Sequence, residues 1–91
     1  MVIKLSKFGE ILTSRPAGHD AYLGAKAYLI SQKSEKIKID FRGVKVLTPA
    51  WMDEFISPLQ KEYGKDRVVF GKSENPSVVA TLEMLSQTFR H

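Results

Sequence analysis

The sequence predicts an α/β fold in which a mixed sheet is covered by helices mainly on one face. Segments of alternating apolar residues and segments with an apolar stripe at helical spacing follow one another in the order β-β-α-β-α-β-α, and this alternation is typical of α/β folds. The clearest strand, residues 36–41, alternates Ile37, Ile39 and Phe41 with polar residues. A strand covered by helices on both faces is apolar throughout, so one face of the sheet is predicted to be wet.

The length and composition are those of one small globular domain, residues 1–91. With 43% hydrophobic and 26% charged residues, the chain resembles ordinary soluble proteins and can bury one modest core. It has no cysteine, which excludes disulfides and thiolate metal sites. No apolar segment approaches the roughly 20 residues that cross a bilayer, and the N-terminal segment lacks a signal-peptide pattern. We therefore expect a cytoplasmic protein with no membrane association.

The first third of the chain predicts two short strands followed by a helix. The strands lie within residues 2–12, around a turn at Gly9, which can adopt a positive φ. The helix is expected after Ser14, because Pro16 suits the first helical position. Its apolar face is predicted at i, i+4, i+7 and i+8 by Ala21, Ala25, Tyr28 and Leu29.

A second helix is predicted to begin after Thr48 and to end at Gly64. Pro58 lies inside it and is expected to bend the helix or to end its first half. The apolar stripe of this helix consists of Met52, Phe55, Ile56, Leu59 and Tyr63.

The last third predicts a strand, "RVVF" at residues 67–70, and a final helix. Asn75 is expected to cap this helix, with Pro76 at its first position. One face of the helix is predicted to contain Val78, Leu82, Leu85 and Phe89.

Most constellations that support catalysis are missing from the sequence. Of the two histidines, His91 is the last residue, and His19 is followed by Asp20, which faces another side of a helix. Asp53 and Glu54 are adjacent and have no third ligand at metal-site spacing. No glycine pattern for a phosphate loop occurs. We therefore predict no catalytic residues, no metal, no cofactor and no enzymatic activity.

The start of the second helix concentrates the residues that could form a site. Thr48 can accept a hydrogen bond from a free amide of the first turn, and Pro49 gives up no needed donor. Asp53 and Glu54 gain slightly from the helix dipole. Trp51 allows two interpretations: it belongs to the core, four residues before Phe55, or it shows its ring to a partner.

Three motifs resemble a known family. They are "SR" at residues 14–15, "DFRGV" at 40–44 and "WMDE" at 51–54. Together they resemble the STAS domains of anti-sigma-factor antagonists and sulphate transporters, and in particular the bacterial STAS-like domain of unknown function. The resemblance extends over residues 8 to 85. It implies a STAS-like fold and a non-catalytic regulatory module of bacterial signalling that binds a histidine-kinase-like ATPase.

In the antagonists that this chain resembles, a serine at the start of the helix is phosphorylated. Here that position is Ala50, which has no hydroxyl, while Thr48 stands where they have an aspartate. Thr48 is the only hydroxyl in the turn and hence the one candidate phosphoacceptor, although a hydroxyl that caps its own helix is a poor one. The resemblance implies a partner-binding patch of Arg42, Lys45, Thr48, Pro49, Ala50, Trp51 and Glu54.

Several alternatives stay open at this point. Arg15 could pair with Asp53 or Glu54, or be exposed and functional. The net charge of +4 permits a nucleic-acid-binding function, although the basic residues are scattered. A small anion could bind at the amides of a helix start, at Thr48 or at Asn75. A second copy of the chain could pair with an edge strand at residues 2–5.

Overall fold

The described strands form two small sheets in the computed structural model, which describes residues 1–29 and 36–88. The larger sheet has the order β1 (Val2–Lys4), β3 (Ile37–Asp40) and β5 (Val68–Phe70), and the smaller one pairs β2 (Ile11–Leu12) with β4 (Val46–Leu47). All of these pairings are parallel, so the described part of the expected mixed sheet contains no antiparallel pair. The α/β fold class is confirmed.

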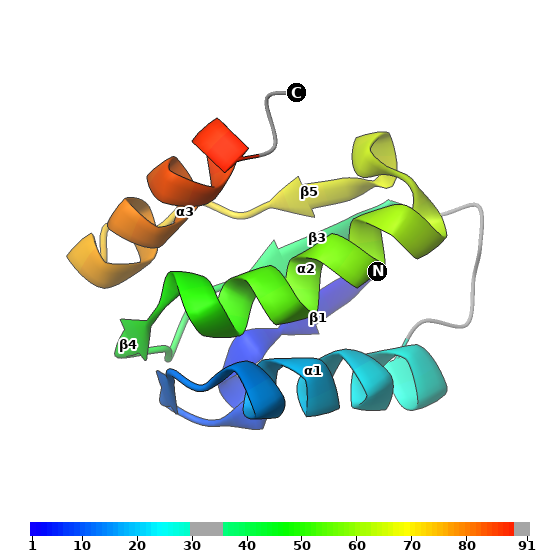
Figure 1. Ribbon diagram of the computed structural model, residues 1–91, viewed down its shortest axis with the longest axis horizontal. Coiled ribbons are helices and arrows are strands. Elements are labelled where there is room, and N and C mark those ends of the chain that lie inside the picture. Colours follow the sequence, from blue (N-terminus) through cyan, green and yellow to red (C-terminus); the bar gives the residue numbers. More distant parts are fainter. Residues whose placement is uncertain (30–35, 89–91) are drawn as a thin grey trace.

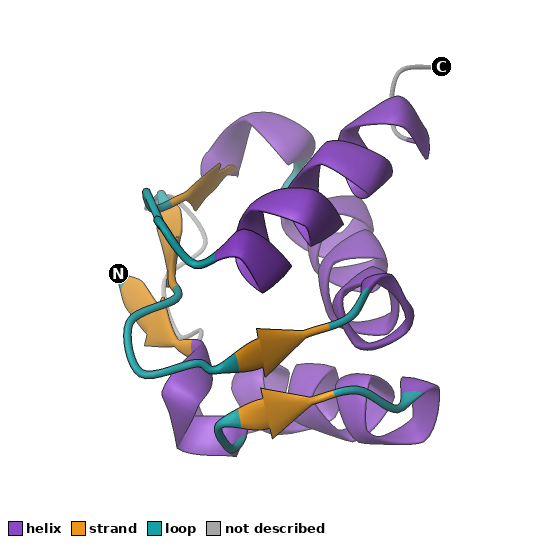
Figure 2. Ribbon diagram, turned by 90° about the vertical axis from the view of Figure 1, so that its left-hand side faces the viewer, coloured by secondary structure: helices purple, strands orange, loops and turns teal. Residues whose placement is uncertain are grey.

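The helices gather on one side of the larger sheet. Figure 1 shows α1 and α2 side by side in front of the strands, with α3 beyond the N-terminal half of α2. In Figure 2, the three-stranded sheet has all three long helices on the same side. The helical elements are α1 (Arg15–Gly24), α2 (Pro49–Tyr63) and α3 (Pro76–Thr88), the short π-helical turn η2 (Ala25–Leu29), and the 3₁₀ turns η1 (Leu5–Phe8) and η3 (Lys65–Arg67). None of these helices, within the described ranges, is long and apolar enough to span a membrane.

The two strands predicted in the first 12 residues exist, but they belong to different sheets. Gly9 lies between them with a φ of 132°, as expected for the turn. β2 pairs with β4, a strand that the sequence analysis did not predict. The pairing continues on both sides of β4, because Val46 N–H donates to the Glu10 carbonyl at 3.1 Å and Thr48 N–H to the Leu12 carbonyl at 3.0 Å. A strand of two residues is too short to show an alternating pattern.

The core lies between the larger sheet and α2, and its composition confirms the predicted faces. The strands contribute Ile3, Ile37 and Ile39, all fully buried. The predicted stripe of α2 is buried too, apart from the partly buried Tyr63 at its end. From α1, η2 and α3 the core takes Ala21, Ala25, Val78 and Leu85, with Leu82 packed against it. The side chains of Tyr28 and Leu29, and the whole of Phe89 and His91, lie outside the described part of the chain.

α2 runs without interruption through Pro58, so this residue does not end the helix. The proline removes one hydrogen bond of the helix, but fully buried residues on either side of it, Ile56 and Leu59, hold the segment against the core. The helix ends at Gly64, whose φ of 99° confirms the predicted C-terminal stop.

Candidate functional site

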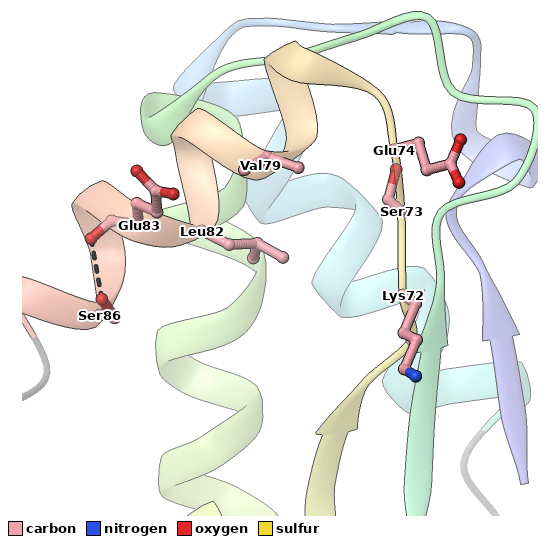
Figure 3. Close-up of a pocket in the computed structure, with 8 residues that line it drawn as sticks. Lys72, Ser73, Glu74, Val79, Leu82, Glu83 and Ser86 are labelled. Atoms are coloured by element: carbon pink, nitrogen blue, oxygen red, sulfur yellow. Dashed lines mark hydrogen bonds between the residues drawn. The ribbon is translucent and has the colours of Figure 1, made fainter.

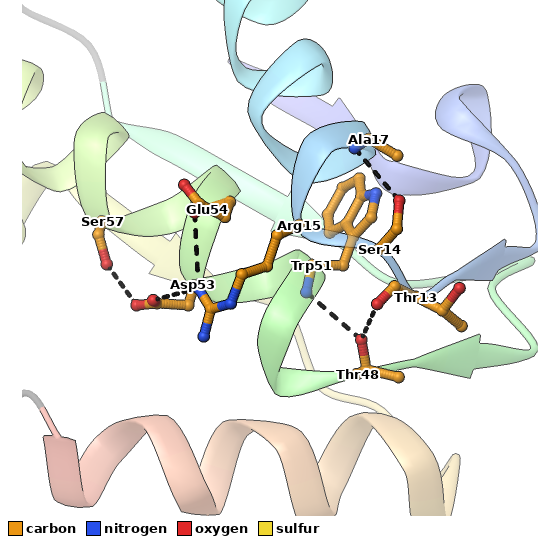
Figure 4. Close-up of polar contacts among 9 residues, drawn as sticks. All are labelled: Thr13, Ser14, Arg15, Ala17, Thr48, Trp51, Asp53, Glu54 and Ser57. Atoms are coloured by element: carbon orange, nitrogen blue, oxygen red, sulfur yellow. Dashed lines mark hydrogen bonds and ion pairs between the residues drawn. The ribbon is translucent and has the colours of Figure 1, made fainter.

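Thr48 caps α2 and also ties it to the segment before α1. Its hydroxyl accepts a hydrogen bond from the Trp51 amide at 3.3 Å, which confirms the predicted N-cap. The same hydroxyl donates to the Thr13 carbonyl at 2.8 Å (Figure 4). Ser14 caps α1 in the same way by accepting from the Ala17 amide. The two helix starts are therefore joined, and the Thr48 hydroxyl acts both as an acceptor and as a donor.

Trp51 belongs to the core. Only 1% of its surface is exposed, and its ring stacks on Phe55 with a centroid distance of 5.2 Å. Phe8, from the turn after β1, covers it at 6.2 Å. Of the two interpretations of this residue, the exposed aromatic for a partner is therefore wrong. The large aromatic ring stabilises the junction of η1, α1 and α2 instead.

Arg15 links the two helix starts on the surface through a small charge cluster. Its guanidinium lies 3.2 Å from an Asp53 carboxylate oxygen and 3.5 Å from one of Glu54 (Figure 4). Ser57 donates to the other Asp53 oxygen at 2.8 Å. The hydrogen bond to Asp53 raises the pKa of Arg15. Because 56% of the Arg15 side chain is exposed, the cluster adds little to stability and is accessible to a partner.

A hollow of about 260 Å³ lies beside this charge cluster. It is lined by Arg15, Pro49 and Asp53 from the two helix starts and by Met84 and Leu85 from α3. Met84 is 59% exposed, whereas Leu85 is buried. An exposed flexible thioether next to a paired arginine is a combination found in protein interfaces.

The structure does not place all residues of the predicted patch together. Arg42 lies on the open side of the larger sheet, where its guanidinium makes a bidentate contact with Asp40 as close as 2.8 Å. Lys45 pairs with Glu10 at 3.6 Å, beside the smaller sheet. Neither lines the hollow at the start of α2, so their part in binding stays a prediction.

The first turns of α3 hold β4 in place, a role that the sequence analysis missed. Asn75 caps α3 as predicted, by accepting from the Ser77 amide, and its NH₂ group donates to the carbonyls of Val44 and Lys45, both at 3.0 Å. Ser77 accepts from the Leu47 amide at 2.9 Å, and Thr81 donates to the Leu47 carbonyl at 2.7 Å. The i, i+4 spacing of Ser77 and Thr81 was the only available signal.

A larger groove, of about 700 Å³, runs between α3 and the loop that precedes it. Figure 3 shows Val79 and Leu82 on the helical wall, opposite Lys72 and Ser73 of the loop. The helical wall is apolar at Val79 and Leu82 and polar at Glu83 and Ser86, where the Ser86 hydroxyl donates to the Glu83 carbonyl at 2.8 Å. Within residues 1–29 and 36–88, no group of three or more histidine, aspartate or glutamate side chains could hold a metal ion.

Asp40 is a buried carboxylate whose charge depends on Arg42. Hydrogen bonds from the Arg42 side chain and amide lower the pKa of Asp40 from 3.8 to about 2. A carboxylate whose pKa is lower in the folded state contributes stability above its unfolded pKa, and this contribution disappears as the pH falls. The loss is therefore expected between about pH 4 and about pH 2.

We expect Arg42→Gln to lower the free energy of unfolding at neutral pH, and the difference from wild type to shrink as the pH falls from about 4 to about 2. Urea titrations followed by circular dichroism at several pH values measure this. Lys45→Gln is the matched control, because its partner Glu10 is exposed, and it should follow wild type throughout. A difference between Arg42→Gln and wild type that is constant down to about pH 2 would contradict the assignment.

Fold and site together define a small α/β domain with a capped and partly exposed helix start. A family model described as a STAS-like domain of unknown function matches residues 25–78, which is more than half of the chain. The chain belongs to this STAS-like family, and the resemblance drawn from its motifs is confirmed. No curated protein and no solved structure matches it. The family assignment favours a non-catalytic domain.

Proposed function

We propose that this domain is a non-catalytic regulatory module of the bacterial cytoplasm that binds a protein partner at the start of α2. The contact surface, called here the α2-start surface, consists of Arg15, Thr48, Pro49, Ala50, Asp53, Glu54 and Met84. The observation that carries the proposal is the exposed Met84 beside the accessible Arg15–Asp53 pair, at a hollow where three helices meet.

The composition of this surface supports a protein partner. Methionine and arginine are enriched at interfaces, where an apolar centre is surrounded by a polar rim. Here Met84 and Pro49 supply the apolar part, and Arg15, Asp53 and Glu54 the rim. The segment beneath is rigid, because both helix starts are capped and joined through Thr48 and Thr13. A rigid surface loses little conformational entropy when a partner binds.

The partner that we propose is a histidine-kinase-like ATPase, as the STAS resemblance implies. Phosphorylation of Thr48 is not part of the proposal. A phosphate on this hydroxyl would remove the bond that it donates to Thr13 and would disturb the α2 cap. Regulation would therefore act through the nucleotide state of the partner.

The test is a pull-down with the tagged protein from nuclease-treated native lysate, with and without ATP, followed by mass spectrometry. Met84→Glu places a charge at the apolar centre and Arg15→Glu reverses the rim charge. The control is Leu23→Glu, which changes an exposed leucine of α1 (48% exposed) that does not line the hollow.

We expect wild type and Leu23→Glu to enrich the same ATPase, and Met84→Glu and Arg15→Glu to lose at least about 90% of it, which corresponds to about 1.4 kcal/mol of binding free energy. The purified ATPase should then bind with the same order of variants. If both site variants retain the ATPase, the contact lies outside the α2-start surface. If wild type enriches no ATPase, the proposed partner class is wrong.

A further inference from the structure

Within residues 1–29 and 36–88, one face of the larger sheet has no helix over it. In Figure 2 the three long helices lie on one side of β1, β3 and β5, and the other side is open. The register places Val2, Lys38 and Val69 in one row across this open face. All three are exposed, Val2 by 53% and Val69 by 39%. The wet face predicted from the alternation of β3 is thus mixed, with apolar side chains on both sides of a lysine.

The open face is strongly positive. Lys4 is paired in register with Asp40, next to the row of Lys38. Arg42 and Lys72 add two further cations, and among the described residues that line a hollow on this face Asp40 is the one carboxylate. Asp40 is buried against Arg42, whose own side chain is 83% exposed. The Arg42 guanidinium therefore pairs with the Asp40 carboxylate and still reaches solvent. In the described part of the chain, this buried carboxylate is accompanied by four cationic side chains, Lys4, Lys38, Arg42 and Lys72.

A hollow of about 610 Å³ lies among these charges. Its lining residues are Lys38, Asp40, Arg42, Val69, Phe70, Gly71 and Lys72. Phe70 is 37% exposed, but it pairs in register with the buried Ile39 and its ring stacks on the buried Phe41 at a centroid distance of 6.3 Å, so the ring lies on the helix side of the sheet. A side chain at position 71 would crowd this hollow, because a Cβ there would lie 3.4 Å from Cε of Lys38 and 3.0 Å from the Ile39 carbonyl oxygen. On the open face, the exposed aliphatic side chains of Val2 and Val69 therefore lie next to positive charge.

We propose that this open face, independently of the α2-start surface, binds single-stranded nucleic acid. Lysine and arginine side chains of this face would neutralise phosphates, and bases would lie on the exposed aliphatic surface of Val2 and Val69. The bases of a duplex are stacked inside it and cannot contact the apolar side chains of this face. In the described part of the chain, the open face also presents no helix that could enter a groove of a duplex. The apolar surface thus favours single strands, whose bases are free to turn out.

The test measures fluorescence anisotropy of a labelled single-stranded DNA of about 12 nucleotides, within the range of known single-strand site sizes, over a series of salt concentrations. Lys38→Gln and Lys72→Gln each remove one cation from the open face. Lys61→Gln, on the exposed side of α2, is the matched control. Val69→Ser removes apolar contact without changing charge.

We expect each open-face lysine variant to reduce the slope of log affinity against log salt by about 0.7, as for one phosphate contact on a single strand. Val69→Ser should weaken binding at every salt concentration and leave the slope unchanged. Lys61→Gln should behave as wild type. The duplex of the same sequence should bind more weakly than the single strand.

Four outcomes would overturn the proposal. If Lys61→Gln reduces the slope as much as Lys38→Gln, binding reflects overall charge and not this face. If the duplex binds as tightly as the single strand, or Val69→Ser has no effect, the bases are not contacted. If polyglutamate competes as well as unlabelled DNA at equal charge, the face is a site for acidic polypeptides. Circular dichroism confirms that every variant is folded before binding is compared.

Discussion

Replacing Trp51 by alanine is expected to lower the free energy of unfolding by about 3–5 kcal/mol, the usual cost of truncating a large buried aromatic. Trp51 is 1% exposed and its ring forms one cluster with the rings of Phe8 and Phe55. A domain of this size has a total stability of only about 5–14 kcal/mol at 0.05–0.15 kcal/mol per residue. The variant should therefore unfold at much lower urea concentration, as measured by circular dichroism.

Met84→Ala is the matched control for this prediction. It truncates another large side chain near the start of α2, but one that is 59% exposed, and should change the free energy of unfolding by no more than about 0.5 kcal/mol. If Trp51→Ala were as stable as Met84→Ala, the tryptophan would not be part of the core. The comparison also matters for binding, because a loss of partner binding in Trp51→Ala would report loss of the fold.

Gly18→Ala is expected to destabilise the protein by about 1–3 kcal/mol, the range for overpacking a core. Gly18 is buried where α1 meets the first turn of α2, and a Cβ there would overlap the Trp51 carbonyl oxygen. This contact is with backbone, so no side-chain rotation can relieve it. The helices would have to move apart, which would disturb the Thr48–Thr13 bond as well.

The control for Gly18 is Gly24→Ala, a second glycine of the same helix. The atom nearest to a Cβ added at Gly24 is a Phe8 ring carbon at 4.0 Å, which is an ordinary contact distance. Alanine there should be neutral or should stabilise the protein by about 0.4–1 kcal/mol. Urea denaturation measures the stability of both variants. Equal effects at the two positions would show that helix propensity, and not the contact between α1 and α2, determines the change in stability.

The helices could be predicted from the sequence because their signals are local. Thr48, Pro49 and Gly64 mark the ends of α2 within a few residues of the helix itself, and the stripe from Met52 to Leu59 indicates its buried face. The same holds for the Asn75 cap of α3. The strand β4 could not be predicted in this way, since its two residues depend on β2 and on Ser77 and Thr81, 30 or more positions away.

The candidate site was predicted in part. Its centre at the start of α2 followed from the cap and the family motifs, and the link from Arg15 to Asp53 and Glu54 was one of two alternatives that the sequence allowed. Met84 was not predicted, because nothing in α3 indicates that it lies against α1 and α2. Arg42 and Lys45 were expected beside the helix start, but the turn after β3 directs them to other surfaces.

By itself the sequence determined the order of the elements other than β4, together with the caps, the buried stripes and the wet face of β3, because each depends on neighbours within one or two turns of chain. Only the tertiary structure decided whether Trp51 is buried, since Phe8 covers it from more than 40 positions away. It also decided that the cations of three separate segments share one open face. Spacing along the chain sets the face on which a side chain lies, whereas packing sets what it meets there.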